Sequence, residues 1–112
     1  MMFNRKDPRR LRAVRGVILQ LIWVAGNGES LNPSDPFAIS RGVLLTALEQ
    51  MRQLPGETDL TNAVRYCEER GYLEVTWSAD RSEFESLRLT TNGIDLVEGT
   101  TTDAGVIVPS LR

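Results

Sequence analysis

The stretch that decides the fold is residues 68–93, EERGYLEVTWSADRSEFESLRLTTNG. Apolar and polar side chains alternate over residues 72–78, and they alternate again over residues 86–90. Such alternation is typical of strands with one buried face. The two strands flank the charged tip ADRSEFE, so the sequence predicts one antiparallel hairpin. We expect no apolar cluster in this tip that could bury against a core.

Helical patterns surround the hairpin. Apolar residues recur at three- and four-residue steps in three preceding segments, which predicts helices over residues 8–24, 41–53 and 59–70. A loop over residues 26–38 is long enough that we expect residues 37–39 to anchor it as a short strand. The residues with capping or helix-ending chemistry at the expected ends are Gly26, Ser40, Thr58, Gly71, and Thr90 or Thr91.

Length and composition indicate one globular domain, and the predicted elements make it an α+β fold, mainly α-helical with a small antiparallel β-hairpin. The 112 residues suffice for a single core, and 41% hydrophobic with 25% charged residues is close to the globular average. The longest apolar run, residues 17–25, is about half of what a membrane helix needs, and no cleavage pattern follows it. We therefore expect a cytoplasmic protein that does not interact with membranes.

The residue inventory argues against catalysis and metal binding. There is no histidine to act as a general base, and no glycine-rich phosphate loop occurs in the chain. The single cysteine, Cys67, cannot form an internal disulfide, and structural zinc is excluded. Cys67 lies on the apolar stripe of the third helix, so we interpret it as an inert core residue. We predict a protein that is not an enzyme and that needs no cofactor or metal.

The charge is polarised along the chain. The first 16 residues carry six basic side chains and one acid, a net charge of +5, whereas the other 96 carry seven basic side chains and fourteen acids, a net charge of −7. Two interpretations stay open for the basic arm, residues 1–12. It is either a phosphate-contacting element or an element without that role, namely a solvated, frayed terminus or a partner of the protein's own acidic surface.

Residues 63–75 and 79–99 resemble the recognition helix, wing hairpin and trailing helix of winged helix-turn-helix proteins, particularly the MarR-like and PadR-like groups. In those families a Leu-Glu-x-x-Gly-Leu/Tyr helix end precedes a strand, an Asp-Arg wing and Leu-Thr-x-x-Gly. The residues at matching positions are Glu69, Gly71, Tyr72, Leu73, Asp80, Arg81, Leu89, Thr90 and Gly93. The resemblance covers about residues 37–98. A weaker similarity, in LTTNGIDLVEGT and the DAGVIVP tail, is to small winged-helix proteins of Mu-like phages and prophages.

The resemblance implies a winged-helix domain over residues 1–98, with a three-helix core plus wing. It also implies a DNA-binding function, as a transcriptional regulator or a phage DNA-transaction accessory. Helix 59–70 would enter the major groove of duplex DNA, and wing 78–86 would touch the flanking backbone or the minor groove. The expected DNA contacts are Arg65, Asn62, Thr61, Tyr66, Arg81, Arg41, Arg9, Arg10 and Arg12.

The predicted contacts divide into base readers and phosphate contacts. Asn62 and Arg65 have side chains that pair with adenine and guanine edges, whereas Thr61 and Tyr66 would reach phosphate. Carboxylates interrupt this surface on the helix and on the wing, and they reduce affinity for a polyanion. The alternative is therefore a winged-helix protein-protein interaction module that does not bind DNA.

Self-association is a further expectation. Trp23 either caps the core or supports a dimer contact. Trp23, Leu21 and residues 105–109 are candidates for a homodimer surface, because winged-helix regulators often pair through elements outside the core motif. The tail, residues 99–112, is left open as an added strand, a swapped arm or a disordered segment.

Overall fold

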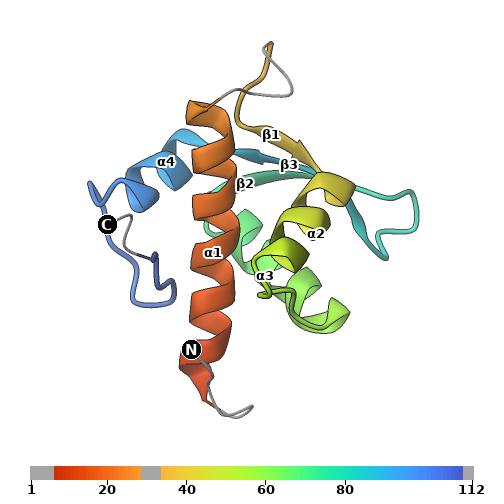
Figure 1. Cartoon of the computed structure of the whole chain (residues 1–112), viewed down its shortest axis with the longest axis horizontal. Coiled ribbons are helices and arrows are strands. Elements are labelled where there is room, and N and C mark those ends of the chain that lie inside the picture. Colours follow the sequence, from red (N-terminus) through yellow and green to blue (C-terminus); the bar gives the residue numbers. More distant parts are fainter. Residues whose placement is uncertain (1–6, 29–33, 110–112) are drawn as a thin grey trace.

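The computed structural model describes residues 7–28 and 34–109. Helix α1 crosses the molecule, with α2 and α3 on one side and α4 with the C-terminal segment on the other (Figure 1). The described residues form an α+β fold, as the sequence predicts, and its layout is compatible with a winged helix. The elements in chain order are α1 (Pro8–Asn27), β1 (Ala38–Ser40), α2 (Arg41–Gln50), α3 (Glu57–Glu69), β2 (Leu73–Trp77), β3 (Phe84–Leu89) and α4 (Thr91–Val97).

The sheet is antiparallel, with strand order β1-β3-β2. Leu87 of the central strand lies opposite Ile39 of β1 and Val75 of β2. The expected hairpin is thus confirmed, and the short strand expected near residues 37–39 joins it as β1. This pairing brings the start of α2 to the same sheet that carries the hairpin.

The hairpin tip corrects one expectation. Thr76 pairs with Ser86, but the next pair is Trp77 with Phe84, so Glu85 has no partner across the ladder. An extra residue of this kind is a β-bulge, and it reverses which side chains face inward. Phe84 is therefore fully buried, and the prediction that nothing in the tip reaches the core was wrong.

Helix α1 extends further than predicted. Asp7 caps it by accepting a hydrogen bond from the Arg9 amide, and proline follows at the first helical position. Gly26 was expected to end the helix, yet the helix continues to Asn27. A Cβ on Gly26 would stand 2.3 Å from the Phe37 ring, so that ring packs directly on the helix backbone. This packing offsets the ~1 kcal/mol by which an interior glycine disfavours a helix.

The turn between α2 and α3 also differs from the prediction. Helix α2 ends at Gln50 rather than near residue 53, and Arg52 adopts a left-handed φ of 56° that redirects the chain. Helix α3 is capped by Gly56 without a side-chain hydrogen bond, so Thr58 lies inside the helix and is not its cap. Acidic residues in the first turn of α3 complement the helix dipole in place of a side-chain cap.

Three other predicted helix ends are confirmed. The Ser40 hydroxyl accepts from the Val43 amide at 3.3 Å, and the Thr90 hydroxyl accepts from the Gly93 amide at 3.1 Å. Gly71 follows α3 with a φ of 79°, a left-handed conformation that glycine adopts without steric cost.

One core lies between α1, α2, α3 and the inner face of the sheet. Each large side chain buried there stabilises the fold by ~1.5–3 kcal/mol. The largest fully buried side chains are Phe84, Ile18, Leu19, Ile22, Leu44, Leu48, Leu60, Leu87, Leu89, Val64 and Cys67.

The C-terminal segment, residues 99–109, packs on α1 as an irregular chain. The Ile107 amide donates to the Arg12 carbonyl at 3.0 Å, and Val106 is buried. A Cβ on Gly16 would stand 1.7 Å from the Ile107 carbonyl oxygen, so only glycine permits this contact. The described part of the tail therefore belongs to the same core as residues 7–98.

Candidate nucleic-acid interface

Helix α3 presents one polar face to solvent. Its apolar side, including Leu60 and Val64, is buried against the core, which turns the opposite side outward. Asn62 and Arg65 are exposed on that outer side, whereas Thr61 is half-buried. Of the side chains predicted on this helix, Asn62 and Arg65 are thus the ones most open to an approaching partner.

The wing turn is held by a network around Asp80. The Asp80 carboxylate accepts hydrogen bonds from the Ser82 amide and hydroxyl and from the Ser78 hydroxyl, at 2.7–3.0 Å. These hydrogen bonds, those of Ser82 first, lower the pKa of Asp80 to about 2. Arg81 follows with a left-handed φ of 58°, which is uncommon outside glycine. The network thus stabilises an otherwise unfavourable conformation at Arg81.

Arg65 of α3 and Arg81 of the wing meet at the Trp77 ring. Their guanidinium carbons lie 5.0 Å and 5.6 Å from its centroid, which is cation–π range. Arg65 Nη2 also donates to the Arg81 carbonyl at 3.3 Å. The indole nitrogen of Trp77 donates to the Glu68 carboxylate at 3.2 Å. We call Arg65, Glu68, Trp77 and Arg81 the Trp77 cluster.

The predicted DNA contacts did not include Trp77. Alternation along β2 placed it among the inward residues, and it is in fact half-buried where the strand ladder shifts register. The sequence signal that could have indicated Trp77 was its position, immediately before the turn that contains Arg81 and close in sequence to the helix that carries Arg65.

Arg41, a predicted phosphate contact, is engaged inside the molecule. Its side chain is 19% exposed and lies 3.7 Å from Glu57 and 3.9 Å from Glu83. Its guanidinium carbon is 4.6 Å from the Phe84 ring centroid. Arg41 therefore links the starts of α2, α3 and β3, and carboxylates already offset its charge.

The described basic residues of the arm lie in α1. Arg9 pairs with Asp7 at 2.6 Å, and Arg10 pairs with Asp59 at the start of α3. The backbone carbonyl of Arg12 holds the C-terminal segment. Residues 8–12 of the arm are helical, as predicted for the helix that begins at residue 8, while the arm's residues 1–6 lie outside the described residues.

Tyr66 lies on a different side of α3 from Arg65. Its ring is 3.7 Å from the Arg15 guanidinium carbon and 5.2 Å from that of Arg70. A Cβ on Gly105 would stand 1.9 Å from the Tyr66 hydroxyl, so the C-terminal segment covers this ring closely. We call Arg15, Tyr66, Arg70 and Asp103 the Tyr66 cluster. This location removes Tyr66 from the face that carries Asn62 and Arg65.

Asp103 anchors the segment over the Tyr66 cluster. Its side chain is 7% exposed, and it accepts from the Tyr72 hydroxyl at 2.6 Å and the Gly105 amide at 2.7 Å. The Tyr72 hydrogen bond lowers the pKa of Asp103. Burial, and then the Asp103 contact, raises the pKa of Tyr72 to about 12.

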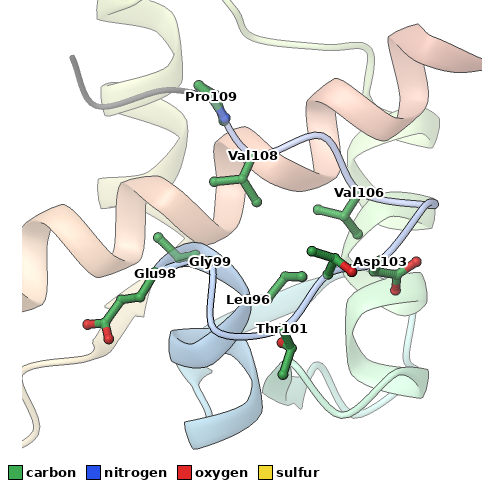
Figure 2. Close-up of a pocket in the computed structure, with 10 residues that line it drawn as sticks. Leu96, Glu98, Gly99, Thr101, Asp103, Val106, Val108 and Pro109 are labelled. Carbon is green, nitrogen blue, oxygen red and sulfur yellow. The ribbon is translucent and has the colours of Figure 1, made fainter.

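A shallow pocket of about 430 Å³ separates α4 from the C-terminal segment (Figure 2). Apolar side chains dominate its lining, and Glu98 and Asp103 lie at opposite ends of it. The Glu98 carboxylate accepts from the Trp23 indole nitrogen at 3.0 Å. Of the candidate dimer residues, Leu21 and Trp23 pack partly on the core, and Ile107 is 40% exposed. The lining residues are Leu96, Val97, Glu98, Gly99, Thr101, Thr102, Asp103, Val106, Val108 and Pro109.

Cys67 is fully buried, and burial raises the pKa of its thiol to about 12. A thiol of this kind stays protonated at neutral pH and is a poor nucleophile. In the parts of the chain that the structure describes, no group of three or more histidine, cysteine or carboxylate side chains is arranged to hold a metal ion.

No helix within residues 7–28 and 34–109 has the length and apolar character that a bilayer crossing requires. Comparison with protein-family models, with curated proteins and with solved structures gives no match. What the chain does is therefore inferred from its own sequence and geometry.

Proposed function

We propose that this chain binds duplex DNA through the exposed face of α3 and the wing between β2 and β3. One observation carries the proposal, namely that Arg65 and Arg81 come from separate elements and meet at Trp77. Arginine is the side chain best suited to phosphate and to base edges. A helix beside a β-ribbon is also the geometry with which winged helix-turn-helix proteins contact the two grooves. A role as a transcriptional regulator or a phage DNA-transaction accessory would follow.

The distribution of ion pairs indicates that the proposed DNA contact surface is small. Arg41 and Arg10 have carboxylate partners, which reduces their value to a phosphate. Within the described residues, neither Arg65 nor Arg81 forms an ion pair with a carboxylate within 4.0 Å. The two arginines without a carboxylate partner thus lie where α3 meets the wing, where the Glu68 carboxylate accepts from Trp77.

Carboxylates limit the expected affinity. Glu69 is exposed on α3, and Glu83 and Glu85 flank the wing turn. Like charges near a polyanion weaken association, and the remaining attraction depends steeply on salt. We expect weak binding that is measurable at low ionic strength.

Fluorescence anisotropy with a labelled random-sequence duplex, at 50 mM and 200 mM salt, tests the proposal. The full-length protein should bind at 50 mM, and binding should weaken steeply at 200 mM. The double variant Arg65→Ala/Arg81→Ala should lose most of this affinity. Arg88→Ala is the matched control, because Arg88 is an exposed arginine of β3 already paired with Asp35 and Glu74. Absence of binding at 50 mM, or equal binding by the double variant, would reject the proposal.

The basic N-terminus is tested separately. Residues 1–6 carry Arg5 and Lys6 and precede α1, so Arg5→Ser/Lys6→Ser changes charge without removing any helical residue. A reduced salt dependence in this variant would assign a phosphate contact to the arm. An unchanged salt dependence would show that the arm has no part in binding.

A protein-protein interaction module is the second candidate, and a different surface favours it. Val43, Met51 and Leu54 are 39%, 44% and 45% exposed on α2 and the turn after it. A shallow, largely apolar groove runs along the same helix, lined by Gly42, Val43, Thr46, Ala47 and Gln50. Exposed apolar side chains of this kind are typical of interaction surfaces. If the wild-type protein binds no duplex, Val43→Ser and Met51→Ser in a partner-capture experiment become the deciding variants.

A further inference from the structure

The contacts of Arg65 orient it toward the wing. Its guanidinium lies over the Trp77 ring, and its Nη2 donates to the Arg81 carbonyl. A guanine-reading arginine needs two N–H groups directed together at one base edge. Here one of the terminal nitrogens is already bonded to the wing, and the planar group lies beside an indole. Arg65 is thus held against the wing, the element expected beside the DNA backbone, and this placement favours a backbone contact over base reading.

Arg81 converges on the same ring from the other element. The guanidinium carbons of Arg65 and Arg81 lie 5.0 Å and 5.6 Å from the Trp77 ring centroid. The Trp77 indole nitrogen is engaged by Glu68, which fixes the ring that both arginines contact. Both cations are thus held at one ring before any ligand arrives.

The wing turn preorganises this pair. The left-handed conformation of Arg81 directs its carbonyl to Arg65, and the Asp80 hydrogen bonds hold that conformation. Preorganised side chains lose less conformational entropy on binding than mobile ones. An anion that approached both guanidiniums would therefore find the geometry already formed.

We propose that Arg65, Trp77 and Arg81 form a single phosphate clamp, and that the chain grips the DNA backbone here without reading bases through Arg65. The proposal rests on the proposed function and assigns its ligand chemistry, a phosphodiester of duplex DNA. Arg65 and Arg81 contact phosphate, and Trp77 is a positioning residue that acts through them. Of the two base readers predicted from the sequence, Asn62 alone keeps that role.

The test measures the Kd of three duplexes of equal length, one rich in G·C, one rich in A·T and one mixed, over a series of salt concentrations. Arg65→Ala and Arg81→Ala should each weaken binding to all three duplexes alike. Each neutralised phosphate contributes about 0.9 to the salt exponent, so one lost contact corresponds to an about eightfold loss at ~0.1 M salt. The exponent itself should fall by about one.

Trp77→Leu separates the clamp from two independent arginines. This variant changes no charge, yet it should weaken binding to a similar degree, and adding Arg65→Ala should cost little more. Trp77→Phe keeps an aromatic ring and should retain most of the affinity, and Arg88→Ala should match the wild type. Circular dichroism and thermal unfolding check that each variant folds.

Three results would overturn the clamp. The first is a loss in Arg65→Ala confined to the G·C-rich duplex, which would leave the proposed function standing and restore Arg65 as a base reader. The second is unchanged binding by Trp77→Leu. The third is a wild-type protein that binds no duplex at low salt, which removes the clamp and the proposed function together. If Trp77→Leu does not fold, the comparison of Arg65→Ala across the three duplexes decides alone.

Discussion

Two neighbouring residues of α3, Arg65 and Tyr66, take part in arginine-aromatic clusters of contrasting kinds. The Tyr66 cluster is covered by the C-terminal segment, and Asp103 supplies it with a buried carboxylate. Among residues 7–28 and 34–109 nothing covers the Trp77 cluster in a comparable way, and both of its arginines are exposed. On the side of α3 that carries Tyr66, the arginine-aromatic contacts therefore join parts of the chain. On the side that carries Arg65, the arginines of such contacts are available to a ligand.

The largest predicted loss of stability comes from a side chain introduced between α1 and the C-terminal segment. Gly16→Ala places a Cβ where the Ile107 carbonyl now lies, so the segment must shift. Overpacking of this severity destabilises by up to ~3 kcal/mol. Chemical denaturation measures the loss, and faster hydrogen exchange in residues 103–109 would locate it. Gly42→Ala is the control, since its Cβ would meet nothing within 4 Å and should stabilise α2 by ~0.5–1 kcal/mol.

Exchanging the two aromatic rings for leucine tests the comparison directly. Tyr66→Leu should destabilise the fold by ~2 kcal/mol, because it removes a ring packed between Arg15 and the C-terminal segment. Its DNA affinity, measured where the variant is folded, should stay within about twofold of the wild type, a change of under ~0.5 kcal/mol. Trp77→Leu should show the reverse pattern. Parallel losses of stability and affinity in both variants would mean that the two clusters do not differ in role.

Alkaline pH should affect the closed cluster. Tyr72 has its pKa raised from 10.0 to about 12 in the folded chain, so its contribution to stability is complete below pH 10 and is lost as the pH rises toward 12. Unfolding midpoints of the wild type should therefore decline across this window. Tyr72→Phe removes the titrating hydroxyl and should flatten that part of the decline. An identical slope in the variant would contradict the assignment, and the buried Cys67 thiol would be the next group to test.

The smallest effect is expected outside both clusters. Arg88 is 48% exposed and lies 3.2 Å from Asp35 and 3.5 Å from Glu74. Exposed ion pairs are worth ~0.2–1 kcal/mol and are screened by salt. Arg88→Ala should accordingly lower stability by less than ~1 kcal/mol, with no difference from the wild type at high salt. A larger loss would indicate that this side of the sheet matters more than its exposure suggests.

Periodicity predicted the elements of the fold well because it records which side chains are buried. The stripes of the helices and the alternation in β2 led to core positions such as Ile18, Leu48 and Leu73. Val43, which the stripe of α2 would turn inward, is instead exposed. The burial of Phe84 was not predicted, because the bulged residue Glu85 reverses which side chains of β3 face inward. Strict alternation in the sequence contains no sign of such a bulge. Gly26 was wrongly expected to end α1 for a related reason. The contact of its backbone with the Phe37 ring is a tertiary interaction, whereas helix propensity describes only the local chain.

The C-terminal segment and the Trp77 cluster were harder to foresee. The segment is held in part through backbone groups, such as the Ile107 amide on the Arg12 carbonyl, and these leave no trace in side-chain patterns. Arg65 and Arg81 were predicted separately, and only the folded structure places them on one ring. Arg41 was selected for its charge, and its carboxylate partners come from the start of α3 and from the wing.

The position of Arg41 has a consequence for how quickly a ligand is taken up. Arg41 is the first residue of α2, and its side chain contacts residues at the starts of α3 and β3. These contacts hold α3 and the wing in a fixed position relative to α2. A surface that needs no rearrangement associates at a rate set by diffusion and by charge steering. Uptake of DNA should then follow single-phase kinetics whose rate rises in proportion to DNA concentration without reaching a plateau.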